Sequence, residues 1–169
     1  MDLVNNIQIN NLRSDNHYMV IDKIPEFSYK ITHVSLPDVS LGDLDLNNPF
    51  TTIKIPGTSI EFSNLTITFL VDEDLVNYKK LWYWMLTFKE FNILSDDTFK
   101  SQEEIYKKIS GDLFSNAKLS LLTNNKNINV NITFYDLYPK SLNNLNFNTK
   151  STEPVLCDVT FRYNRYDFE

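Results

Sequence analysis

Three adjacent carboxylates, Asp72, Glu73 and Asp74, form the densest group of side chains with possible chemistry in this sequence. Such a group could bind a cation or transfer protons. No second cluster elsewhere in the chain has the spacing of metal ligands, which a protein cation site would need. Acidic residues directly before an apolar helical stretch are typical of a helix N-terminus, where they accept hydrogen bonds from free amides and complement the helix dipole. We therefore predict that Asp72 is a helix N-cap.

The histidines, the cysteine and the serines form no catalytic pattern. His17 and His33 have no ligand spacing to each other and no neighbouring cysteine. Cys157 falls among the inward positions of a predicted strand, where burial raises the pKa of a thiol, so we expect it to be inert. Ser141 lacks the G-x-S-x-G turn of a serine nucleophile. We predict no catalytic residue, no cofactor-binding residue, no metal ligand and no cofactor, and hence a protein that is not an enzyme.

Composition excludes further classes of function. The chain has 169 residues, 16 Lys and Arg against 22 Asp and Glu, and a net charge of −6. This balance argues against binding nucleic acid through its phosphates. Three glycines are too few for a Rossmann or P-loop nucleotide site. The length of the chain predicts a single domain over residues 1–169. No apolar run is long enough to cross a membrane, and the start does not resemble a signal peptide. We therefore expect the protein to be used in a cytosol-like compartment, without a membrane partner.

Helical periodicity predicts one solid helix over residues 72–90. Its apolar stripe is formed by Leu75, Tyr78, Trp82, Met85 and Leu86. Trp82 lies on this stripe and is expected in the core, whereas Trp84 lies off it and is expected at a contact between chains. A capping-box pattern at 101–104 predicts a short second helix within residues 95–111.

Period-two alternation predicts seven or eight strands. The clearest alternation of apolar positions covers six ranges, which are residues 18–21, 27–36, 60–71, 117–121, 128–138 and 155–163. Changes of phase predict bulges near Thr32 or His33 and at Ser63–Asn64. Because helix does not alternate with strand, the predicted fold is mainly β, an antiparallel β-sandwich or open barrel with one flanking helix.

Two segments are predicted to leave this body as arms. Residues 1–15 form an N-terminal arm. Residues 37–57 combine prolines, glycines and acids with large apolar side chains, as expected of a long protruding arm that something else covers. The predicted contact residues of this arm are Leu41, Leu44, Leu46, Phe50 and Ile53.

The order of the motifs resembles the tube proteins of contractile-tailed bacteriophages, both the tail-tube protein and the tube proteins at the baseplate end. The matching segments are residues 16–20, 34–37, 55–57, 65–69, 72–82, 134–142, 145–147 and 159–163. The most specific of them is Phe134–Leu142. The segments cover about residues 16–168, although 95–111 has no counterpart in the pattern.

The resemblance implies a structural virion protein of a phage tail. Such a subunit forms a sixfold homo-oligomeric ring of the tail tube, or of its baseplate end, through which DNA passes, and it contacts other tube, baseplate or sheath proteins. The arm at 37–57 is then the segment that reaches the next ring. The virion tail is the expected location, after assembly in the host cytoplasm. A stand-alone β-sandwich module that binds peptide or carbohydrate through exposed Tyr163 and Tyr166 is the alternative.

Overall fold

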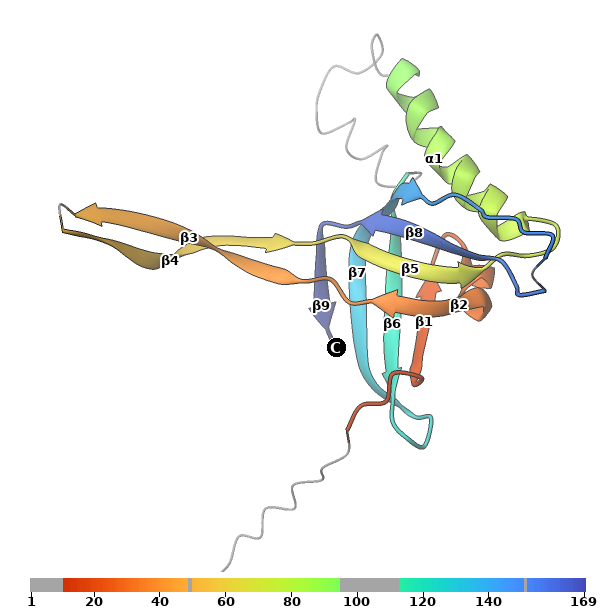
Figure 1. Ribbon diagram of the computed structural model, residues 1–169, viewed down its shortest axis with the longest axis horizontal. Helices are drawn as coiled ribbons and strands as arrows, with labels where there is room; N and C mark the ends of the chain where they lie inside the picture. The colour runs from red at the N-terminus through yellow and green to blue at the C-terminus, as the bar shows by residue number, and fades with distance from the viewer. Residues whose placement is uncertain (1–10, 49, 95–112, 151) are drawn as a thin grey trace, which may run out of the picture.

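The computed structural model describes residues 11–48, 50–94, 113–150 and 152–169, with side chains outside 46–48 and 90–94. Figure 1 shows a β-sheet body, one helix packed over it and a long two-stranded arm that projects from it. The elements in chain order are β1 (His17–Ile21), a 3-10 helix (Pro25–Lys30), β2 (Ile31–Ser35), β3 (Val39–Asn48), β4 (Thr51–Phe62), β5 (Leu65–Leu70), α1 (Val76–Leu94), β6 (Ser115–Leu122), β7 (Ile128–Leu142), β8 (Leu156–Arg162) and β9 (Arg165–Phe168).

The body is a seven-stranded sheet that folds into two layers through one long strand. Its strand order is β1-β6-β7-β8-β5-β2, with β9 also paired to β7, and every pairing is antiparallel. The first part of β7 pairs with β6 and its last part, from Tyr138, pairs with β8. The change of partner follows Asp136, whose φ of 54° is a left-handed conformation that bends a strand. The predicted antiparallel, sandwich-like fold is confirmed, with no closed barrel among the described strands.

The core lies between these layers because the strands alternate strictly. Along β5, Leu65, Ile67 and Phe69 are buried while the residues between them are only partly covered. Strand β8 repeats the pattern with Val159 and Phe161. This is the period expected of strands with one face in a core. The body therefore has its own hydrophobic core and needs no partner to bury these residues.

Helix α1 begins four residues later than predicted. Leu75 has a φ of 57°, which a helical residue cannot adopt, and the carbonyl of Asp72 accepts a hydrogen bond from the Leu75 amide in a turn. Buried Asn77, rather than Asp72, organises the start: its Oδ1 accepts from the amides of Asp72 and Tyr78, and its Nδ2 donates to the carbonyl of Leu70. The carboxylate of Asp72 instead forms an ion pair with Lys30 at 3.1 Å.

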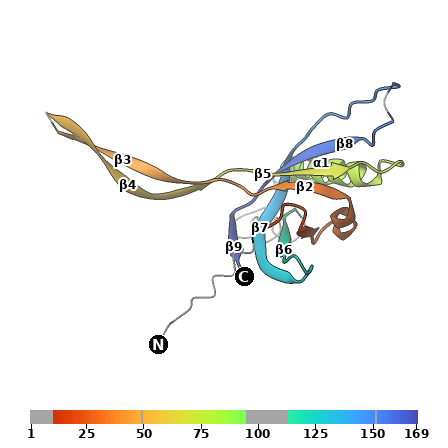
Figure 2. The same ribbon diagram turned by 60° about the horizontal axis from the view of Figure 1, so that its bottom comes forward.

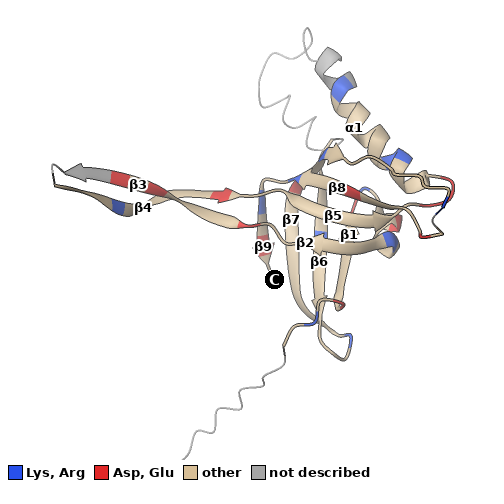
Figure 3. Ribbon diagram, in the orientation of Figure 1, with Lys and Arg blue, Asp and Glu red and all other residues tan. Residues whose placement is uncertain are grey.

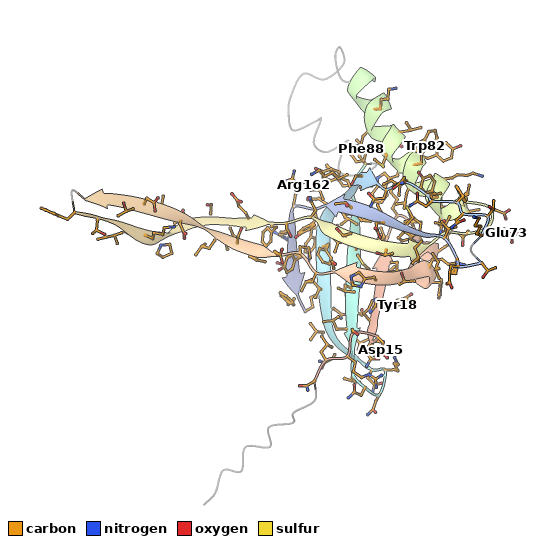
Figure 4. All side chains as sticks on the ribbon, viewed as in Figure 1. Asp15, Tyr18, Glu73, Trp82, Phe88 and Arg162 are labelled. Carbon is orange, nitrogen blue, oxygen red and sulfur yellow. The ribbon has the colours of Figure 1, made fainter. Side chains whose placement is uncertain are left out.

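The two tryptophans of α1 are placed opposite to the prediction. Trp84 is 3% exposed, and its indole N–H donates to the carbonyl of Leu113 at 2.6 Å. Trp82 is 46% exposed and lies edge-on to Tyr83. Figure 4 shows Trp82 and Phe88 on different sides of the helix. The helix carries apolar residues on all sides, so the periodicity of the sequence cannot identify one buried face. In the structure the buried face contains Leu81 and Trp84, not Trp82.

Of the other local predictions, some are confirmed and some are wrong. Residues 25–30, predicted in part as strand, form a 3-10 helix with Pro25 in its first turn. The bulge near His33 is confirmed by a register shift between Ile31 and His33. Pro139 does not end β7, since it is paired with Phe161 and the strand continues beyond it. The predicted second helix within 95–111 lies outside the described residues. No helix of the described residues is long and apolar enough to cross a membrane.

Candidate assembly interface

The candidate interface is the arm, formed by β3 and β4, which lies outside the hydrophobic core of the body. Among the described strands, these two pair only with each other, from Val39↔Phe62 at the root to Asn48↔Thr51 at the tip. Figures 1 and 2 both show the arm extending away from the body. The predicted arm at 37–57 is therefore present, but it continues to Phe62. The predicted strand 60–71 is divided at Ser63–Asn64, where the chain leaves the arm and enters the sheet.

The register gives the outer half of the arm one apolar and one polar face. Directly paired residues of an antiparallel ladder project to the same face. Leu44 is paired with Ile55, and Leu46 with Ile53, which places these four positions on one face. Asp45 is paired with Lys54 on the other. The outer arm is an amphipathic ribbon.

The predicted contact residues lie along this ribbon, and those with described side chains are open to solvent. Leu44 is 58% exposed, Ile53 51% and Leu41 52%, and Phe50 near the tip is 95% exposed. Leu46 lies in β3 by its backbone, but its side chain falls outside the described residues. The prediction omitted further exposed apolar residues of the same strands, which are Val39, Ile55, Ile60 and Phe62. For the residues of β4, the available signal was the alternation at Ile53 and Ile55 and again at Ile60 and Phe62. A patch of this kind marks an interaction surface.

Hydrogen bonds and aromatic rings hold the root of the arm against the body. The amide of Asp38 donates to Ser63 Oγ at 2.7 Å, and the amide of Ser63 donates to the carbonyl of Asp38 at 3.0 Å. The ring of Phe62 lies 6.2 Å from that of Tyr163 and 5.4 Å from that of Tyr166. Tyr163 is 8% exposed, so it cannot serve as the exposed aromatic that the alternative binding module requires.

The structure does not bring the other candidate residues together. The ring of His17 is hydrogen-bonded to the carbonyl of Ser14, and that of His33 to Ser35 Oγ. Arg165 lies over the ring of Tyr135 at 4.6 Å. Within the described parts of the chain, no three His, Cys, Asp or Glu side chains are placed to hold a metal ion. Figure 3 shows the charges scattered over the body, with acidic residues along the arm.

Cys157 is predicted to stay unreactive while the body is folded. Its side chain is buried, and burial, followed by the adjacent carboxylate of Asp158, raises the pKa of the thiol to about 11. The thiolate is the reactive form, so an aromatic disulfide reagent at pH 8 should label the native protein only slowly. Labelling should become complete in denaturant and should accelerate in the native protein only as the pH approaches 11. Rapid stoichiometric labelling of native protein at pH 8 would contradict this placement.

Comparison with solved structures finds the same fold in chains of three contractile assemblies. The chain is similar to the PVC sheath/tube terminator of an extracellular contractile injection system, with a TM-score of 0.63 at 16% identity over 94% of this chain and 96% of that one. The tube terminating cap of the anti-feeding prophage gives 0.61 at 14% identity, over 94% and 91%. A chain of the PVC sheath-tube complex gives 0.60 at 15% identity, over 96% and 93%.

At these identities the solved structures establish the fold alone, and among curated protein sequences none matches this chain. A family model described as phage tail tube protein matches residues 4–169, which includes the arm, the helix and all strands of the body. The sequence resemblance and the two-layered sheet with its projecting arm agree with that match. A structural family of this kind argues against an enzymatic role. The chain belongs to the phage tail tube protein family.

Proposed function

We propose that this protein is a structural subunit of a phage tail, forming a ring of the inner tail tube or of the baseplate or terminal end of that tube. The observation that carries the proposal is the family match over residues 4–169. The projecting arm supports the proposal, because a group of exposed apolar residues of this kind marks an interaction surface. Solved neighbours that are tube, cap and sheath-tube chains support contacts with other tube, sheath or baseplate proteins.

The body supports assembly into a homo-oligomeric ring, which we propose to be sixfold. In the part of the chain that the structure describes, β1 and β2 end the main path of the sheet, and β9 is paired on one side, to β7. Free strand edges promote pairing with other chains, and a closed ring removes them. Neighbouring subunits in a ring would pair these edges and extend the sheets into a common inner wall.

The net charge of −6 supports passage of DNA through that ring. Phosphates are repelled by an acidic surface, so a negatively charged lumen would let DNA move without adhering. The proposed location is the virion tail, after assembly in the host cytoplasm.

In this proposal the arm joins one ring to the next. Leu41, Leu44, Leu46, Phe50 and Ile53 become buried against a subunit of the adjacent ring. Covering one such side chain fully contributes about 1.5–3 kcal/mol. Six arms acting together would hold rings in a stack without covalent links.

Electron microscopy of the purified protein and of the virion that contains it tests the proposal. We expect rings or tubes of this chain, and density for it in the tail. A concentrated protein that stays monomeric by sedimentation, together with tails that lack the chain, would overturn the proposal.

A further inference from the structure

The hydrophobic core of the body reaches the surface in a cleft between its two layers. The cleft has a volume of about 230 Å³. Buried Leu119 and Ile132 contribute to its inner wall, while Val34 and Leu121 are only partly covered. Leu36, which directly follows β2, is an exposed part of the same lining. The cleft is therefore a place where the core continues outward without side chains to fill it.

The two strands that end the sheet both border this cleft. Among the described strands, β1 and β2 are the two ends of the main strand order. His17, the first residue of β1, is paired with Leu121 near the end of β6, and both line the cleft. His33 and Val34 of β2 line it from the other layer. The long strand β7 joins the layers elsewhere, so the core at this side depends on a further segment for its cover.

The size and chemistry of the cleft suit aliphatic side chains. Its volume lies below the about 300–1,000 Å³ that is usual for small-molecule pockets. The polar groups of its lining are engaged by the chain itself: both histidine rings are hydrogen-bonded within the chain, and Arg13 is paired with Asp15 at 3.1 Å. What the cleft offers to an occupant is mainly apolar contact.

The N-terminal segment, residues 1–10, starts beside this cleft and carries suitable side chains. Leu12 itself lines the cleft, and residues 1–10 lie outside the described part of the chain. The apolar residues of the segment are Leu3, Val4, Ile7 and Ile9. Ile9 is three residues from Leu12, a span of at most about 10 Å. Asn10 and Asn11 lie between them, and asparagine is favoured where a chain turns back.

We propose that the N-terminal segment fills this cleft in its own subunit, with the side chains of Ile7 and Ile9 directed into it. These two residues alternate with Asn6 and Gln8, so an extended segment places both isoleucines on one face and the amides on the other. The short connection favours the same chain over a second copy, because a short tether holds its segment at an effective concentration in the millimolar range.

The inference goes beyond the proposed tube function and does not depend on it. It concerns how the isolated subunit completes its core. It requires only that side chains enter the cleft, so it leaves the edges of β1 and β2 available for the pairing between neighbouring subunits proposed above.

Unfolding of dispersed subunits tests whether the segment is part of the fold. We expect Ile7→Asp with Ile9→Asp to raise the unfolding equilibrium constant in urea about tenfold or more, because the apolar side chains would no longer be buried. Asn6→Asp with Gln8→Asp is the matched control, since it adds the same two charges at the positions of opposite parity, and it should leave the constant unchanged. Equal constants for the two variants would overturn the inference.

Disulfide formation tests where the segment lies. In a Cys157→Ala background, cysteines at Ile9 and Leu36 should form a disulfide within one chain on mild oxidation. The control pair, at Gln8 and Leu36, has almost the same reach but the opposite parity, so its disulfide should form about tenfold more slowly. Equal rates would mean that the segment has no fixed place at the cleft. Disulfide-linked dimers in place of the internal disulfide would identify a second copy as the occupant. Either result would overturn the inference.

Both measurements are made on dispersed subunits, so they separate the inference from the proposed function. A protein that forms no rings but shows the internal disulfide keeps the inference and loses the proposed function. A protein that forms tubes but shows no difference between the matched variants keeps the proposed function and loses the inference.

Discussion

Replacing Leu44 and Ile53 together by aspartate should block stacking of rings while leaving the body folded. Both side chains lie on the apolar face of the outer arm and are more than half exposed in the subunit. The change removes about 1.5–3 kcal/mol of expected burial per arm, because each side chain is already about half covered and full burial is worth about 1.5–3 kcal/mol per side chain, and it adds two charges that the contact would have to desolvate. The effect is repeated at every arm of a ring, so stacks should be absent rather than merely shorter.

Negative-stain microscopy and sedimentation measure stacking, and circular dichroism measures the fold. The free energy of unfolding of the variant should agree with that of the parent within about 0.5 kcal/mol, as is usual for exposed positions. Thr52→Asp is the matched control, because it adds a charge at the neighbouring position on the other face of the ribbon. A double variant that unfolds like a core variant would place the arm in the subunit's own core. One that stacks normally would show that the arm is not the contact.

Trp84→Ala should destabilise the body by about 3–5 kcal/mol, the range for removing a large aromatic side chain from a core. Trp84 is 3% exposed and its ring lies 6.0 Å from that of buried Phe161. Its indole N–H donates to the carbonyl of Leu113, so the substitution also leaves a buried carbonyl without its donor. Against a typical domain stability of about 5–15 kcal/mol such a loss is a large fraction, so the variant should unfold at a much lower urea concentration than the parent.

Trp82→Ala, two residues away on the same helix, is the matched control. Because Trp82 is 46% exposed, the free energy of unfolding in urea should change by less than about 1 kcal/mol. Trp84→Phe should fall between the two, since it keeps most of the apolar volume but loses the donor to Leu113. Equal losses for Trp84→Ala and Trp82→Ala would mean that the helix packs by a different face.

Alternation was sufficient to predict most strands of the body and the class of fold, although it did not predict β9 (Arg165–Phe168). Leu65, Ile67 and Phe69 alternate without interruption and are all fully buried. Antiparallel strands with one face in a core leave this period in the sequence, whatever their neighbours are. The arm was predicted for a related reason: prolines and acids interrupt a central strand, yet the large apolar residues between them are too many for a linker. The ordered motifs also identified the family.

The structure was needed for features that depend on packing between different helices and strands. Helix α1 is apolar on all sides, so the sequence could not determine whether Trp82 or Trp84 enters the core. Packing on the sheet decided it. The start of that helix depended on Asn77 reaching the carbonyl of Leu70, a contact with a strand end that no capping pattern contains.

The sequence by itself determined that this chain is a mainly β tube-family protein with an exposed apolar arm, because strand period and residue type are local properties of the chain. Only the tertiary structure decided that the arm includes Ile60 and Phe62, because strand register is a property of two strands together and here runs from Val39↔Phe62 at the root to Asn48↔Thr51 at the tip.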